Sequence, residues 1–250
     1  MKQADFDLVG PIGSKATLGL VVLQADETLE QDFRRLFTDC DIALYISRIP
    51  SGQTLSADTI AAMEDELPRS AGLFPRAACF DAVGYGCTSG TTLIGADAVA
   101  TMIRKGVKTP VVTDPLTAAL AALNALNVSK IGLVTPYVHT IAAPVRAAFI
   151  EAGFLVGETL TFGEEIEARV ARIAPASIKA AARQAAQGAQ AVFLSCTNLR
   201  TLDIIDELEA ELGLPVLSSN QALAWHMAQL TGAPLAEGSA GMLSKTSMRP

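Results

Sequence analysis

The chain has 250 residues, of which half are hydrophobic and 18% are charged, and its formal net charge is −7. This composition excludes intrinsic disorder, which requires low hydrophobicity and high net charge. Because Lys and Arg are scattered singly in an acidic chain, we expect no nucleic-acid partner and no membrane partner. The sequence begins without the apolar run of a signal peptide, so we expect a cytoplasmic protein.

Short runs rich in β-branched residues alternate with Ala-rich helical patterns along nearly the whole chain. The runs predict strands at residues 18–23, 42–47, 82–85, 110–113, 130–135, 154–161, 191–194 and 215–217. The patterns between them predict helices at 28–37, 57–71, 91–105, 116–126, 141–152, 175–187, 199–212 and 221–230. This alternation is typical of an α/β fold with parallel strands. Residues 231–250 are rich in Gly, Ser, Ala and Pro and are predicted to form a loosely ordered tail.

Three short sequences recur in the same order, each after roughly 110 residues. They are Gly19-Leu20-Val21 with Gly132-Leu133-Val134, Ala82-Val83-x-x-x-Cys87-Thr88 with Ala191-Val192-x-x-x-Cys196-Thr197, and Pro110-Val111-Val112 with Pro215-Val216-Leu217. This repeat predicts two similar Rossmann-like parallel-sheet halves related by a pseudo-twofold axis, with an active-site cleft between them. We expect residues 1–114 and 220–250 to form the first half and residues 115–219 to form the second.

The repeat separates the four cysteines into two kinds. Cys40 and Cys79 have no repeat partner and are predicted to be small buried packing residues. Cys87 and Cys196 each follow a strand, and ligands of parallel sheets bind at the carboxyl ends of strands. We therefore expect these two thiols on opposite walls of the cleft. With no C-x-x-C pair and only two histidines, a metal site is not expected.

Small polar residues follow both paired cysteines and lead into predicted helices: Thr88 and Ser89 in the first half, Thr197 and Asn198 in the second. A helix N-terminus can hold a carboxylate and can lower the pKa of a thiol. Two facing thiols can move a proton across a carbon atom, or add to an activated double bond and release it. We therefore predict that Cys87 and Cys196 are catalytic and that the four polar residues bind substrate. Ordinary packing of the two cysteines is the alternative.

Other strand ends supply further candidates for the cleft. Asp26 and Tyr137 follow the first strand of each half and could hold a polar group of the substrate. Helix capping is the simpler alternative for Asp26. Side chains that could hydrogen-bond behind the site follow the last strand of each half: Thr113, Asp114, Ser218, Ser219 and Asn220.

The glycines around Cys87 suggest a different class of protein. Gly84-x-Gly86-x-x-x-Gly90 follows a strand and precedes a helix, as a dinucleotide-binding loop does. The spacing is one residue longer than in the G-x-G-x-x-G fingerprint, and the repeat partner keeps the cysteine but not the glycines. A nucleotide-binding enzyme is therefore the least favoured alternative.

The segments Gly84-Tyr85-Gly86-Cys87-Thr88, Thr135-Pro136-Tyr137 and Leu194-Ser195-Cys196-Thr197-Asn198 resemble the aspartate/glutamate racemase superfamily. The resemblance covers roughly residues 18–230 and is greatest to maleate cis–trans isomerases and their ectoine-utilisation relatives, then to arylmalonate decarboxylases. It implies a cofactor-independent isomerase or racemase acting on a small carboxylate or an amino-acid-like substrate. Cys87 would be the nucleophile and Cys196 would supply or take the proton. A decarboxylase, which would use only the second cysteine, and a non-catalytic module that binds a small acid are the alternatives.

One position departs from that resemblance. Asp26 stands where maleate isomerases have an asparagine that contacts a substrate carboxylate. Two carboxylates 4 Å apart repel by about 1 kcal/mol even in bulk water. Either Asp26 caps a helix and points away, or the substrate carries a cationic group. The sequence also leaves room for a homo-oligomer.

Overall fold

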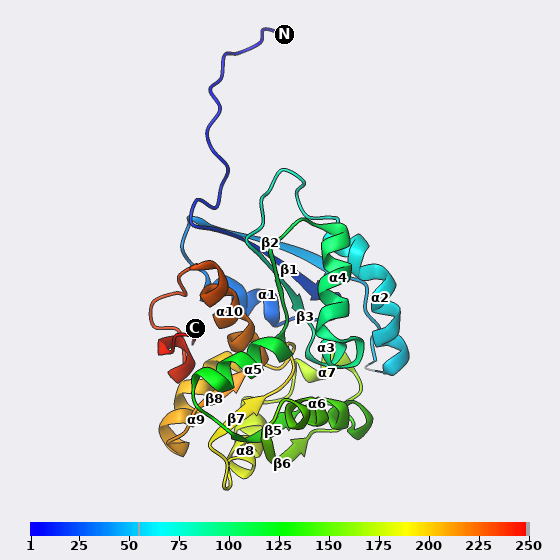
Figure 1. Cartoon of the computed structure of the whole chain (residues 1–250), viewed down its shortest axis with the longest axis vertical. Coiled ribbons are helices and arrows are strands. Elements are labelled where there is room, and N and C mark those ends of the chain that lie inside the picture. The colour runs from blue at the N-terminus through cyan, green and yellow to red at the C-terminus, as the bar shows by residue number, and fades with distance from the viewer. Residues whose placement is uncertain (55, 249–250) are drawn as a thin grey trace.

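The computed structural model describes residues 1–54 and 56–248, which form two α/β lobes, each built on a four-stranded parallel sheet (Figure 1). The first sheet has the order β2-β1-β3-β4 and comprises β1 (Ala16–Leu23), β2 (Ile42–Ile49), β3 (Ala82–Gly86) and β4 (Val111–Thr113). The second has the equivalent order β6-β5-β7-β8 and comprises β5 (Lys130–Thr135), β6 (Leu155–Thr161), β7 (Ala191–Leu194) and β8 (Val216–Ser218). The predicted fold class and the internal repeat of strands are confirmed.

Before β5 the chain forms the helices α1 (Leu29–Leu36), α2 (Ala57–Ala71), α3 (Thr88–Ile94), α4 (Ala96–Gly106) and α5 (Pro115–Ala125). Those that follow are α6 (His139–Glu151), α7 (Glu167–Val170), α8 (Pro175–Ala185), α9 (Ile205–Leu212) and α10 (Ser219–Thr231). The single helix predicted at 91–105 is wrong: the chain forms α3 and α4, which are separated at Gly95. Gly95 has a φ of 94°, which a helix cannot contain and which glycine adopts without strain. The short helix α7 was not predicted.

The inner strands are buried on both faces, and this explains why their sequences are continuously apolar. All residues of β1, β3 and β7 are buried. Helices therefore cover both sides of each sheet. At Gly132 in β5 a Cβ atom would lie 1.9 Å from the carbonyl oxygen of Ala185, so glycine lets α8 approach the second sheet closely.

Helix α10 connects the lobes. It follows β8 of the second sheet, yet it packs against β3 and β4 of the first sheet and against α1 and α5. Its residues from Ser219 to Ala228 are all buried. The division at residues 114 and 220 remains a prediction, while the packing of α10 supports grouping the C-terminal segment with the first lobe.

The C-terminal segment is ordered, which corrects the prediction of a loose tail. Trp225 Nε1 donates to the Thr246 carbonyl at 2.7 Å, and Gln221 Nε2 donates to the Ala240 carbonyl at 2.7 Å. Leu243, in the 3₁₀ turn Met242–Lys245, is completely buried. The segment thus covers the outer face of α10. The N-terminal residues extend away from the lobes (Figure 1). Among the described residues, no helix has the length and apolarity that a membrane crossing requires.

Candidate active site

Cys87 lies at the junction of β3 and α3, where it is the N-cap residue of the helix. Its Sγ accepts a hydrogen bond from the Gly90 backbone N–H at 3.1 Å, and the Ser89 hydroxyl lies 3.6 Å from the same sulfur. A Cβ atom at Gly90 would lie 2.6 Å from the Tyr85 hydroxyl and 2.9 Å from Cys87 Sγ. The glycine therefore makes room for the thiol and the phenol beside it.

Cys196 occupies the equivalent place after β7, in an unusual backbone conformation. Its φ is 114°, a region that non-glycine residues rarely adopt and that often marks a functional site. Its backbone N–H donates to the Ser219 hydroxyl at 3.0 Å. The surrounding structure therefore holds the residue in a strained conformation that local sequence preference does not favour.

Tyr137, at the end of β5, lies close to both thiols. Burial raises the pKa of Tyr137 well above its ordinary value, and its electrostatic coupling to Cys196 and to Cys87 raises it further. Its hydroxyl lies next to the Cys196 thiol and stays protonated, so it can donate a hydrogen bond there. The structure thus brings the two predicted catalytic residues to one place, with Tyr137 beside them.

The thiols are not activated in this unliganded protein, contrary to the expectation that a helix N-terminus lowers their pKa. Burial raises the pKa of Cys87 to about 11, although Ser89 and the Gly90 N–H oppose the shift. Burial also raises the pKa of Cys196 well above its ordinary value, and the nearby charge of Glu167 adds to the shift. The desolvation of a buried thiolate outweighs the helix field here.

Hydrogen bonds from α10 and from the two cysteine loops join the lobes. The Ser219 hydroxyl, which receives the Cys196 N–H, also lies 2.9 Å from the Thr88 hydroxyl. The Thr197 hydroxyl donates to the Gly86 carbonyl at 3.2 Å. Asn220 Nδ2 donates to the Thr197 carbonyl and to Asp32 Oδ2, both at 2.8 Å. Thr88 and Thr197, predicted to bind substrate, therefore hold the two thiol loops together.

Asp26 caps a helix and also lies close to the thiols. Its Oδ1 accepts from the backbone N–H groups of Thr28 and Leu29, both at 2.8 Å, at the start of α1. Its Oδ2 is buried without a hydrogen-bond partner. The charge of Asp26 also contributes to the raised pKa of Cys196, after burial and the charge of Glu167.

Both polar atoms of the Asn198 side-chain amide are hydrogen-bonded to other residues of the protein. Its Oδ1 accepts from the Glu27 backbone N–H at 2.9 Å, and its Nδ2 donates to the Glu167 carbonyl oxygen at 3.0 Å and to Glu167 Oε2 at 3.1 Å. The side chain predicted to bind substrate therefore fastens the loop after β1 to α7.

Glu167 is the main residue that sequence reasoning missed. It is only 4% exposed, and burial raises its pKa to about 7. Its charge raises the pKa of both Cys87 and Cys196. In the sequence, Glu167 is one acid among others in a segment without clear periodicity. It reaches the site through the four-residue helix α7, which was not predicted.

The segment that carries Glu167 closes the site from outside. The Glu167 backbone N–H donates to the Gln53 carbonyl at 3.1 Å, and Thr54 and Ile166 form an isolated antiparallel bridge. Arg172 forms two hydrogen bonds to the Glu27 carboxylate, at 2.6 and 3.0 Å. All eight predicted site residues are less than 5% exposed. The predicted cleft is thus closed in this structure.

The glycines that suggested a phosphate-binding loop have packing explanations. A Cβ atom at Gly84 would lie 2.9 Å from Met227 Sδ, and one at Gly86 would lie 2.2 Å from Leu29 Cδ2. Gly84 therefore admits α10 against β3, and Gly86 admits α1. Asp114, predicted to hydrogen-bond behind the site, caps α5 through the backbone N–H groups of Leu116 and Thr117, both at 2.9 Å.

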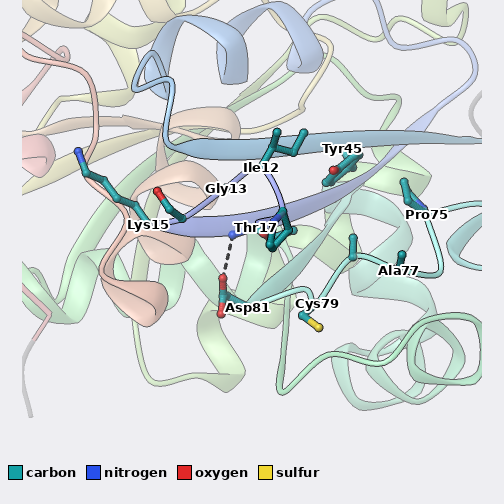
Figure 2. A pocket seen from close by; sticks show the side chains of 12 residues that line it. Ile12, Gly13, Lys15, Thr17, Tyr45, Pro75, Ala77, Cys79 and Asp81 are labelled. Carbon is teal, nitrogen blue, oxygen red and sulfur yellow. Dashed lines mark hydrogen bonds between the residues drawn. The ribbon is translucent and has the colours of Figure 1, made fainter. Parts of the chain in front are cut away.

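A pocket of about 510 Å³ lies at the other end of the first sheet, near the amino end of β1 (Figure 2). Its wall includes Lys15, Tyr45, Cys79 and Asp81, and the Asp81 carboxylate accepts from the Thr17 backbone N–H at 2.8 Å. The eight residues of β1 separate this pocket from the thiols by roughly 25 Å, at about 3.3 Å per residue. It takes no part in the candidate site.

The prediction that Cys40 and Cys79 are buried packing residues is wrong, because both are exposed. Cys40 follows Asp39 and precedes Asp41 in the turn before β2, and these three side chains could together reach one metal ion. Asp39 is already paired with Lys15 at 2.6 Å. The cluster is on the surface, far from the paired thiols in the fold.

Comparisons with known proteins agree with the geometry. Arylmalonate decarboxylase from Bordetella bronchiseptica is 33% identical over 123 residues, which cover 48% of this chain and 51% of that protein. The chain thus matches about half the length of this relative. Maleate isomerase from Nocardia farcinica is 26% identical over 238 residues, which cover 90% of this chain and 94% of that protein.

A solved structure shows the same architecture. It is a cysteine-to-serine variant of Nocardia farcinica maleate cis-trans isomerase with a covalently bound succinylcysteine intermediate, 25% identical to this chain. The match covers 92% of this chain and 98% of that one, with a TM-score of 0.81. These full-length matches confirm the expectation of an isomerase-type enzyme and the resemblance to the racemase superfamily.

The family model for arylmalonate decarboxylase matches residues 80–244. This range contains both paired cysteines, Tyr137 and Glu167, and it covers most of the chain. The chain therefore belongs to the arylmalonate decarboxylase family.

Proposed function

We propose that this protein is a cofactor-independent cis–trans isomerase of a small unsaturated carboxylate, with Cys87 as nucleophile and Cys196 as proton donor and acceptor. The observation that carries the proposal is the pair of buried thiols, one from each lobe, beside one protonated Tyr137. The full-length likeness to maleate isomerase, and the succinylcysteine in the Nocardia enzyme, support a covalent route.

The reaction begins when Cys87, which its raised pKa keeps mostly protonated, has released its proton to solvent and its thiolate adds to one carbon of the double bond. A C–S bond forms, and the π electrons move to the neighbouring carbon, where the adjacent carboxylate delocalises them. The Cys196 thiol protonates that carbon, and the new single bond rotates. Cys196 then removes the proton, the double bond re-forms in the trans arrangement, and the C–S bond breaks to return the Cys87 thiolate.

The surroundings of each sulfur suit these roles. The Gly90 N–H and the Ser89 hydroxyl can stabilise negative charge on Cys87. The Tyr137 hydroxyl can do the same for Cys196 after proton transfer. Burial excludes water from the covalent adduct, which would otherwise exchange its protons with solvent.

Cysteine variants test this mechanism. Cys87→Ser should lower turnover of cis substrates by at least ~1,000-fold, because the weaker nucleophile cannot form the adduct. Cys196→Ser should do the same and should accumulate an adduct on Cys87 that intact-protein mass spectrometry detects. Cys40→Ser and Cys79→Ser are matched controls on the surface and should keep full activity. Full turnover in either site variant would exclude the two-thiol mechanism.

Decarboxylation is the second candidate, because the family model and the Bordetella relative favour it. A decarboxylase would release CO₂ from arylmalonates and would need only Cys196 to protonate the product carbanion. Incubation of the protein and of Cys87→Ser with phenylmalonate separates the candidates. Release of CO₂ by both proteins, without cis–trans turnover, would replace the isomerase proposal with the decarboxylase.

A further inference from the structure

Two acidic side chains, Asp26 and Glu167, are buried beside the paired thiols. They come from different lobes, Asp26 from the loop after β1 and Glu167 from α7, and they are 3% and 4% exposed. The charge of each raises the pKa of Cys196, and the charge of Asp26 also raises the pKa of Glu167. The Asn198 amide joins the two segments: its Oδ1 accepts from the backbone N–H of Glu27, the residue after Asp26, and its Nδ2 donates to Glu167 Oε2.

Neither carboxyl group has a cationic partner within hydrogen-bond distance in the described part of the chain. Glu167 is bonded to the Asn198 amide. Asp26 Oδ1 receives two backbone N–H groups, while its Oδ2 has no partner. The positive charge of Arg48 acts on Asp26, but its guanidinium donates to the Leu23 and Asp26 backbone carbonyls and to Glu30.

Such an arrangement of buried acidic groups lowers the stability of the folded protein. A buried carboxylate oxygen without a hydrogen bond loses its hydration and gains nothing in return. Two carboxylates in a medium of low dielectric constant also repel each other. A ligand that brings a positive charge and N–H donors removes both costs, because charge-assisted hydrogen bonds are roughly twice as strong as neutral ones.

We propose that the substrate is a small carboxylate that also carries a protonated nitrogen, and that Asp26 and Glu167 bind this nitrogen. This inference rests on the proposed two-thiol isomerase and names the class of its substrate. In this proposal the protonated nitrogen donates to Asp26 Oδ2, next to the two thiols. A dicarboxylate such as maleate would instead place its second negative charge against two carboxylates and is a poor substrate.

Ligand binding at pH 8, above the pKa of about 7 of Glu167, tests the proposal without any need for turnover. Three probes share a short chain and one carboxylate: 4-aminobutyrate, pentanoate, which has a methyl group in place of the ammonium, and glutarate, which has a second carboxylate. Calorimetry should give a Kd for 4-aminobutyrate at least tenfold lower than for the other two. Equal or tighter binding of glutarate, or no binding of 4-aminobutyrate, would overturn the proposal.

Variants assign the preference to the two acids. Asp26→Asn keeps the oxygen that caps α1, and Glu167→Gln keeps an acceptor for Asn198, so both are expected to fold. The double variant should lose the preference for 4-aminobutyrate by at least tenfold. Glu165→Gln, which removes one charge from an exposed acid in the same segment as Glu167, should keep the preference. A preference that survives in the double variant would also overturn the proposal.

Measurements of turnover distinguish a failure of this substrate proposal from a failure of the isomerase proposal on which it rests. The wild-type protein should convert cis-4-aminocrotonate to its trans isomer at least tenfold faster than it converts maleate to fumarate. If maleate is converted faster and the ammonium preference is absent, the substrate class is wrong and the isomerase stands. If 4-aminobutyrate binds as expected but no alkene is isomerised, the isomerase proposal fails while the cation subsite stands.

Discussion

The carboxyl group of Glu167 makes the stability of the protein depend on pH. Its pKa is about 7 in the folded protein, against an ordinary value of 4.5. Between these pH values the unfolded chain has released the proton while the folded protein retains it. Rising pH therefore lowers the free energy of unfolding from about pH 4.5 to pH 7, by up to about 3 kcal/mol for this residue. Asp32, with a pKa of about 6, acts in the same direction.

We expect Glu167→Gln to reduce this dependence on pH. Because glutamine does not ionise, the variant should gain roughly 1–3 kcal/mol over wild type on going from pH 4.5 to pH 8. Urea unfolding of both proteins at the two pH values measures the difference. Parallel loss of stability in wild type and variant would show that Glu167 does not titrate in this range.

Residues at the site differ in how far the sequence could reveal them. Cys87 and Cys196 could be predicted because the repeat marks both, although the exposure of Cys40 and Cys79 was missed. The raised pKa of the thiols could not be predicted, because it depends on how completely the lobes exclude water. Glu167 contacts Asn198 across 31 residues of sequence, and only folding brings them together.

At the scale of elements, α10 positions the two thiol loops through one side chain. The Ser219 hydroxyl is hydrogen-bonded to the Cys196 backbone and to Thr88. Removal of this hydroxyl leaves the strained Cys196 conformation, with its φ of 114°, without one of its restraints. Ser219 is thus a positioning residue and does not itself need to touch substrate.

Ser219→Ala should therefore lower kcat by roughly tenfold to a hundredfold with a smaller change in KM. Ser219→Thr, which keeps the hydroxyl, should restore most of the activity. Ser218→Ala is the matched control: Ser218 caps α10 by accepting from the Gln221 N–H. It should cost about 1 kcal/mol of stability while kcat stays near wild type. Equal kcat in Ser219→Ala and wild type would show that the hydroxyl does not position Cys196.

The positions of all eight strands could be predicted. The inner strands β1, β3 and β7 are buried throughout and therefore leave continuous apolar runs in the sequence. The break between α3 and α4 at Gly95 could not be predicted, because a single glycine does not change the hydrophobic periodicity around it. The helix α7 could not be predicted either, because four residues are too few to show a helical period. The packing of α10 against the first sheet could not be predicted from the local sequence pattern either. It depends on contacts with the other sheet, and the sequence marked it only through the repeat.

At the scale of the whole molecule, the two ends of the chain differ in their contribution to stability. The N-terminal residues 1–11 are exposed, including Phe6, Leu8 and Val9. The C-terminal segment instead covers Trp225, which is completely buried, and contributes the buried Leu243. The fold therefore depends on its last residues and not on its first.

Deletion of residues 240–250 should lower the free energy of unfolding by several kcal/mol, on the order of 3, because it uncovers Trp225 and removes Leu243. Deletion of residues 1–10 should change it by less than about 0.5 kcal/mol. Chemical denaturation of both truncated proteins measures the difference. A C-terminal truncation as stable as wild type would show that the segment contacts α10 without stabilising the fold.

The positions of the four cysteines determine which thiols oxidants and alkylating agents can reach. Cys40 and Cys79 are on the surface, while Cys87 and Cys196 are buried and largely protonated. Peroxides and alkylating agents react with accessible thiolates. The surface thiols therefore react first in the folded chain, as adducts or as crosslinks between molecules. The reacting pair is protected as long as both thiols stay buried, so any opening wide enough to admit a substrate would also expose them to these reagents.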